Sequence, residues 1–172
     1  EMVIRQIQKV TDAPVTTILN THVHGDHWLG NQAFRNQWPD VKLYGHPKMI
    51  EKANNGEDQF WVDLMERATQ GFTKGTVAVV PESEVIDSQQ LKLHGLTYKI
   101  YAPDKAHSGT DIMIEVVEDS ILFLGDNVTF MRIARMDDGT FKGNINACDV
   151  ALESGVNLFV PGHGPTSNSI AV

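Results

Sequence analysis

Four side chains that can bind metal ions lie within six positions of the sequence, in the run Thr-His-Val-His-Gly-Asp-His at 21–27. They are His22, His24, Asp26 and His27. So many imidazole and carboxylate groups are costly to place together in a fold unless something pairs with them. A divalent cation is the natural partner, because neutral imidazole and carboxylate are both good metal ligands. A solvated polar turn is the alternative interpretation, but it gives no reason for this density of ligands.

The residues before this run, Val15 to Leu19, are all apolar or β-branched. Such a composition is typical of a parallel strand that is buried on both faces. The run would then begin at the carboxyl end of a strand, which is where open α/β sheets bind their ligands.

Two later strands are expected to end in the same way, on a ligand-type residue beside a glycine. The strand predicted at 121–124 leads to Asp126, and the strand predicted at 157–160 leads to His163. His107 lies in another loop between predicted strands. If these strand ends meet at one edge, they gather all seven side chains into one site.

Seven candidate ligands suit two metal ions better than one, because zinc is commonly held by three protein ligands and a water. His22 and His24 are two positions apart, so they point the same way on an extended backbone. Gly25 allows the chain to turn, so that Asp26 and His27 can face a second ion.

This pattern resembles the metallo-β-lactamase superfamily. The resemblance rests on His-x-His-x-Asp-His and on three further segments, which read Ala-His-Ser-Gly-Thr at 106–110, Leu-Gly-Asp at 124–126 and Pro-Gly-His-Gly at 161–164. It implies an α/β fold of the four-layer αββα sandwich type, in a single domain that covers residues 1–172. In the family, β-strands precede the helix with which this chain begins, so we expect the domain to be incomplete at its N-terminal side.

The resemblance also implies a role for each ligand. One metal ion would bind His22, His24 and His107, the other would bind Asp26, His27 and His163, and Asp126 would bridge the two. The expected cofactor is Zn²⁺, two per chain, with iron or manganese as alternatives.

The residue at the bridging position narrows the expected reaction. Many zinc β-lactamases have cysteine or serine there, whereas Asp126 resembles hydroxyacylglutathione hydrolases, lactonases and related ester or thioester hydrolases. The expected function is therefore a dinuclear zinc hydrolase whose metal-bound hydroxide attacks an ester, thioester, lactone or amide carbonyl. Asp26 would be catalytic as well as ligating, by orienting the nucleophile and accepting its proton.

Other functions remain open at this level. A persulfide dioxygenase-like oxidoreductase shares the fold and would use one non-haem iron on His22, His107 and Asp126. A zinc β-lactamase, a phosphodiesterase or nuclease of the same superfamily, and a non-catalytic binding protein are the further alternatives.

Charge and composition limit the partners. The formal net charge of −8 disfavours binding to nucleic acid and to anionic membrane surfaces. No apolar run approaches the roughly 18 residues of a membrane span. The expected partner is a small-molecule substrate. The oligomeric state is not predicted, and the sequence leaves a cytoplasmic and a periplasmic location both open.

The single cysteine, Cys148, excludes a disulfide within the chain and a four-thiolate zinc site.

Hydrophobic periodicity predicts the remaining elements. Helices are expected at 2–10, 28–38, 48–72 with a break near 54–56, and 144–154; strands are expected at 15–19, 41–44, 91–94, 97–101, 111–117, 121–124 and 157–160. Two side-chain roles stay open. Asp111 could hold a turn or support a ligating histidine, and the apolar residues at 60–65 could form core or a lid over the substrate.

Overall fold

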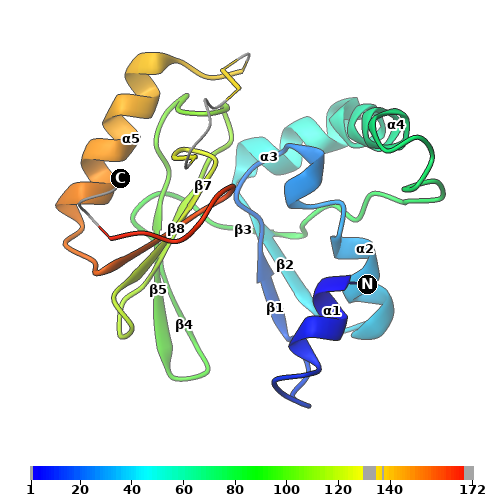
Figure 1. Ribbon diagram of the computed structural model, residues 1–172, viewed down its shortest axis with the longest axis horizontal. Coiled ribbons are helices and arrows are strands. Elements are labelled where there is room, and N and C mark those ends of the chain that lie inside the picture. Colours follow the sequence, from blue (N-terminus) through cyan, green and yellow to red (C-terminus); the bar gives the residue numbers. More distant parts are fainter. Residues whose placement is uncertain (1, 130–134, 137, 169–172) are drawn as a thin grey trace.

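A computed structural model describes residues 2–129, 135–136 and 138–168. Within these residues the chain forms two β-sheets that lie side by side, with helices on the outer side of each (Figure 1). The helical elements are α1 (Met2–Ile7), a 3₁₀ turn (Gly25–His27), α2 (Asn31–Gln37), α3 (Pro47–Lys52), a π-helical segment (Ala53–Glu57), α4 (Asp58–Ala68) and α5 (Phe141–Glu153). The strands are β1 (Thr17–Leu19), β2 (Lys42–Gly45), β3 (Ser83–Glu84), β4 (Gln90–Leu93), β5 (Leu96–Tyr101), β6 (Met113–Val116), β7 (Ile121–Gly125) and β8 (Leu158–Pro161). This arrangement confirms the predicted αββα layers.

The first sheet has the order β1-β2-β3, and both of its strand pairs are parallel. Thr17 lies opposite Lys42 and Leu19 opposite Tyr44. The parallel pairing confirms the prediction for the strand before the metal-binding run. Burial differs from the prediction, since all three β1 residues are only half-buried. The reason is that β1 lies at an edge of its sheet.

The second sheet has the order β4-β5-β6-β7-β8. The predicted hairpin of β4 and β5 turns at His94 and Gly95, which both have positive φ, the geometry that a two-residue hairpin turn requires. β7 and β8 are parallel, with Gly125 opposite Pro161. The carboxyl ends of these two strands therefore lie at the same edge, where Asp126 and His163 follow them.

Two helix boundaries have clear local causes. The predicted break between α3 and α4 is present, and Gly56 there adopts a φ of 105°, which favours glycine. α5 begins at Phe141, three positions before the predicted start, because the hydroxyl of Thr140 accepts a hydrogen bond from the Gly143 N–H and caps the helix.

Three apolar clusters hold the layers together. The first lies between the sheets and consists of Val85, Ile100, Ile112 and Ile114 with the partly buried Leu19 and Tyr44. The second lies under the metal-binding run and consists of Val23, Trp28, Leu29, Met49, Ala53 and Trp61. The third lies against α5 and consists of Met113, Leu122, Leu124, Ala151, Val156 and Phe159. The first cluster joins the two sheets, and the third joins the second sheet to α5. None of the described helices is both long and apolar enough to cross a bilayer.

The α5 cluster gives a direct stability prediction. Leu122 is fully buried on β7, whereas the next residue, Phe123, is 40% exposed on the other face. We expect Leu122→Ala to lower the free energy of unfolding by about 2–5 kcal/mol, because it leaves a cavity in a packed core. Phe123→Ala is the matched control and is expected to cost about 1 kcal/mol or less. Equilibrium urea unfolding measures both, and equal losses would contradict the assignment of Leu122 to the core.

Candidate metal centre

Backbone contacts bring the strand ends of both sheets together. Beyond β1, the carbonyl of Thr21 accepts a hydrogen bond from the N–H of Ile112, the residue just before β6 of the second sheet (2.8 Å). Beyond β8, the Gly162 N–H donates to the carbonyl of Gly125 at the end of β7 (2.7 Å). These bonds fix the three predicted strand ends and the loop before β6 around one point.

The first ligand group consists of His22, His24 and His107, all buried. Their ligand atoms lie within 4.8 Å of one another, and His24 Nδ1 is 3.0 Å from His107 Nε2. Thr21 Oγ1 lies 3.1 Å from His22 Nδ1, so the other ring nitrogen of His22 is the one that faces the group. The structure thus brings together the three residues that the sequence predicts for one ion.

The second ligand group consists of Asp26, His27 and His163. Asp26 Oδ2 lies 3.4 Å from His27 Nε2 and 3.2 Å from His163 Nε2. The side chains of Asp26 and His163 are 42% and 29% exposed, so solvent reaches this group more readily than the first. The 3₁₀ turn at Gly25–His27 places it, as the glycine in the sequence predicts.

Asp126 lies between the two groups. Its Oδ2 is 3.6 Å from His107 Nε2 and 3.4 Å from His163 Nε2, and its Oδ1 is 3.4 Å from His27 Nε2. One carboxylate therefore faces ligands of both groups with its two oxygens. This is the position that a bridging ligand needs.

Two buried atoms in the cluster show that these residues fit a metal ion. His22 Nε2 and Asp126 Oδ1 are both buried and have no hydrogen-bond partner. Buried polar atoms without a partner are rare, because their desolvation is not compensated. Both atoms belong to a set of His22, His27 and Asp126 whose ligand atoms lie within 4.8 Å of one another. A cation at this point would satisfy both.

Electrostatics within the cluster separate the histidines by role. Burial and the nearby His27 hold the pKa of His22 well below its usual range, which keeps its imidazole neutral and able to bind a metal. Burial also opposes protonation of His27, but the carboxylates of Asp126 and Asp26, each 3.4 Å from its Nε2, outweigh it and raise the pKa of His27 to about 9. The nearby imidazole of His27 in turn holds the pKa of the Asp26 carboxyl far below its usual range.

The loop that carries His107 is held by its own side chains. Asp111 is buried and accepts hydrogen bonds from the Ser108 N–H (2.7 Å) and hydroxyl (2.6 Å). Thr110 Oγ1 accepts from the Val23 N–H (3.1 Å) and so ties the loop to the metal-binding run. Of the two roles open for Asp111, the contacts favour the turn.

Sequence reasoning missed a pair of buried amides behind the metal-binding run. Asn31 Nδ2 donates to Asn20 Oδ1 (2.8 Å) and to the Val79 carbonyl (3.1 Å), and Asn20 Nδ2 donates to Asn31 Oδ1 (3.2 Å) and to the His27 carbonyl (3.3 Å). These bonds fix the backbone of His27 to α2. Single asparagines in loops and helix starts carry no distinctive pattern, so only the contact itself shows the role.

This pair leads to a second stability prediction. Asn31→Ala is expected to lower the free energy of unfolding by about 1–3 kcal/mol, because it removes the partner of the buried Asn20 Oδ1 and the donor to the Val79 carbonyl. Asn36→Ala, at an exposed position of the same helix, should change it by about 0.5 kcal/mol or less. Thermal and urea unfolding of the two variants make the comparison, and an equally small effect of both would contradict the network's contribution.

Of the two roles left open for the apolar residues at 60–65, the structure gives Trp61 of α4 the core role. Trp61 is buried, and its ring centroid lies 4.7 Å from that of His24. Phe60 is 51% exposed. Trp61 therefore forms a wall of the first ligand group, while Phe60 lies outside the core.

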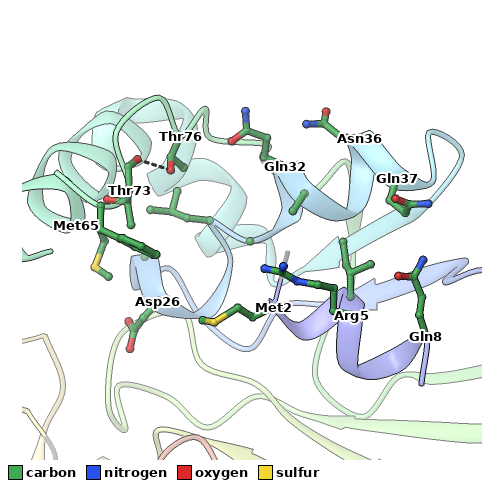
Figure 2. A pocket seen from close by; sticks show the side chains of 16 residues that line it. Met2, Arg5, Gln8, Asp26, Gln32, Asn36, Gln37, Met65, Thr73 and Thr76 are labelled. Carbon is green, nitrogen blue, oxygen red and sulfur yellow. Dashed lines mark hydrogen bonds between the residues drawn. The ribbon is translucent and has the colours of Figure 1, made fainter. Parts of the chain in front are cut away.

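One large cavity lies behind the metal-binding run rather than at the cluster. It has a volume of about 1060 Å³ and is lined by α1, α2 and the segment 72–76. Figure 2 shows Asp26 at its border with the carboxylate turned away from the centre of the cavity. The cavity and the ligand cluster thus lie on opposite sides of the 3₁₀ turn.

Comparison with known structures agrees with the fold. A metallo-β-lactamase from Pontibacter korlensis matches with a TM-score of 0.77 and 17% identity, over 99% of this chain and 71% of that chain. The B3 metallo-β-lactamase BLEG-1 matches with a TM-score of 0.76 and 19% identity, over 99% of this chain and 79% of that chain. TTHA1623 in a di-iron-bound form matches with a TM-score of 0.72 and 21% identity, over 99% of this chain and 80% of that chain. At these identities the likeness concerns the fold alone.

Sequence comparisons give two further results. A search of curated proteins finds no match. The family model of the metallo-beta-lactamase superfamily matches residues 2–166, nearly the whole described chain. With this match, and with a cluster of histidines and aspartates at the strand ends of an αββα sandwich, the chain belongs to the metallo-β-lactamase superfamily.

Proposed function

We propose that this chain is a metal-dependent hydrolase that uses two zinc ions to cleave an ester, thioester, lactone or amide. The first ligand group would hold one ion, the second ligand group would hold the other, and Asp126 would bridge them. Two ions bound there would supply a water nucleophile near neutral pH and polarise the substrate carbonyl.

The observation that carries this proposal is the position of Asp126. A carboxylate that faces His107 and His163 with one oxygen and His27 with the other supports two ions close together rather than one. Asp126 Oδ1 and His22 Nε2 support the same interpretation, because each is a buried ligand atom without a hydrogen-bond partner.

The second ligand group is the more exposed of the two, so the substrate would approach the ions from its side. Asp26 would bind its ion as a carboxylate, which is ionised at neutral pH and is a weak base. It would therefore orient the attacking water by accepting its hydrogen bond. Trp61 would exclude solvent from His24 on the other side.

The metal needs a separate test, because histidine and carboxylate ligands also suit iron. One similar fold, TTHA1623, is described in a di-iron-bound form. Iron in the same two positions is therefore the second candidate, and manganese is a third.

Metal analysis of protein purified without added metal tests the proposal. We expect about two equivalents of zinc per chain, as implied by two three-ligand groups that share a carboxylate. A screen with thioester, lactone and cephalosporin substrates should find hydrolysis that a chelator abolishes and zinc restores. A single equivalent of iron, with no hydrolysis of any substrate in the screen, would overturn the proposal in favour of an iron oxygenase.

A further inference from the structure

Asp138 contacts the ligand cluster although the sequence does not mark it as a ligand. Its Oδ2 lies 3.0 Å from His24 Nε2. His24 is buried, whereas the Asp138 side chain is 44% exposed. Within the described residues, the groups of close metal-binding side chains all lie at the strand ends and none includes Asp138. The carboxylate therefore touches the cluster from outside, through one histidine.

This contact decides which ring nitrogen of His24 can bind a metal. His24 Nδ1 faces His107 Nε2, and His24 Nε2 faces Asp138. A carboxylate only accepts hydrogen bonds, so the ring hydrogen of neutral His24 lies on Nε2. The lone pair is then on Nδ1, which points into the first ligand group. Without the carboxylate, neutral imidazole could place its hydrogen on either nitrogen.

Asp138 is held in place by the turn before α5, which lies directly on the loop that carries His107. The Thr140 N–H donates to the carbonyls of Lys105 (2.9 Å) and Ala106 (3.1 Å), and the Thr140 hydroxyl donates to the Lys105 carbonyl (3.0 Å). A Cβ on Gly139 would collide with the carbonyl oxygen of Ala106. The two backbones are therefore in direct contact, with no side chain between them.

The start of α5 contacts both the loop that carries His107 and the loop that carries Asp126. On the His107 side, Gly143 lies so close to the Lys105 carbonyl that a Cβ on this glycine would collide with it. One residue further on, the Asn144 amide donates to the carbonyl of Asn127. The segment 138–144 thus touches the backbone beside two ligands and the side chain of a third.

From this arrangement we infer that Asp138 is a positioning residue for His24. It fixes the Nε2–H form and the ring orientation that the first ligand group needs, and the contacts of 139–144 hold it at the correct distance. The effect on metal binding rests on the proposed function, because it requires an ion in the first ligand group. The effect on the ring hydrogen does not require a metal.

The metal-free chain tests the contact itself. Long-range ¹H–¹⁵N correlation spectra of histidine-labelled protein should show His24 in the Nε2–H form. Asp138→Ala should populate the other form, while Asp138→Asn should retain the Nε2–H form because its amide oxygen still accepts the hydrogen bond. An unchanged His24 spectrum in Asp138→Ala would overturn the inference, and this readout is independent of any activity.

Metal titration tests the consequence. Zinc competition with a chelator should show about 10–100-fold weaker binding of one equivalent in Asp138→Ala and a smaller loss in Asp138→Asn, with the other equivalent unchanged. Cobalt substitution should alter the visible spectrum of that same equivalent. Asp149→Ala, exposed on α5, is the control and should bind as the unmodified chain does. Unchanged zinc affinity in Asp138→Ala would overturn the inference. Failure of the unmodified chain to bind any metal would instead overturn the proposed function, and the spectra of His24 would then be the test of the contact.

Discussion

Asp126→Ala is expected to abolish tight binding of the second metal equivalent and to lower kcat/KM by on the order of 10³-fold. The reason is that the Asp126 carboxylate lies within 3.6 Å of histidines of both ligand groups, so its loss separates two sites that must share a nucleophile. A second ion stabilises transition-state charge by several kcal/mol, and each 1.36 kcal/mol corresponds to a factor of ten in rate. Metal analysis after dialysis measures the first effect, and steady-state hydrolysis measures the second.

The control is Asp119→Ala, which removes a carboxylate at an exposed position of the turn before β7. It changes the net charge by the same amount as Asp126→Ala but should leave metal content and rate as they were. A variant at position 126 that retained both metal equivalents and full activity would show that Asp126 does not bridge. Retention of one equivalent with loss of activity is the result that the geometry predicts, because the three histidines of the first ligand group remain.

The cluster could be predicted from sequence because its ligands follow a local rule. His22, Asp126 and His163 each lie within three residues of the end of a strand, and strand carboxyl ends meet at one edge of an α/β sheet. The dense run at 21–27, and the glycines beside Asp126 and His163, then indicate which strands carry the ligands. The structure brings all seven predicted side chains together, and the metal they bind remains a prediction.

The supports of the cluster could not be predicted in this way. Asp138 lies 114 positions from His24, and Asn31 lies 48 positions from Val79. Aspartate before a helix and asparagine at a helix start are common for local reasons, since both favour caps and turns. Their contacts depend on how the layers pack, which no pattern within a short segment determines.

The same limit applies to burial and to helix boundaries. The apolar composition of β1 predicts a central strand, but its position at a sheet edge follows from which strands pair, and that is a property of the whole fold. The start of α5 likewise depends on the Thr140 cap. The position of Thr140 is set by its hydrogen bonds to Lys105 and Ala106, which are distant in the sequence.

Gly162→Ala tests the strand-end geometry without removing any ligand. A Cβ at position 162 would collide with Asp126 Oδ1 and would lie 2.9 Å from the carbonyl carbon and oxygen of Gly125. The strand ends must then separate, or the Asp126 carboxylate must rotate away from His27. Either change moves Asp126 out of its place between the two groups. We expect zinc affinity at one equivalent to fall by about 10–100-fold, as for loss of a ligand's support, and the free energy of unfolding to fall by about 1–3 kcal/mol from overpacking.

Gly30→Ala is the matched control for this substitution. Gly30 has helical φ and ψ angles of −65° and −16°, and a Cβ there would meet no atom within 4 Å. The added methyl group should therefore change neither zinc affinity nor hydrolysis. Chelator competition and urea unfolding on both variants separate the two effects of Gly162→Ala. Loss of stability with unchanged zinc affinity would mean that the strands separate without moving Asp126, and that the bridging carboxylate is held by its metal ions rather than by the close approach of β7 and β8.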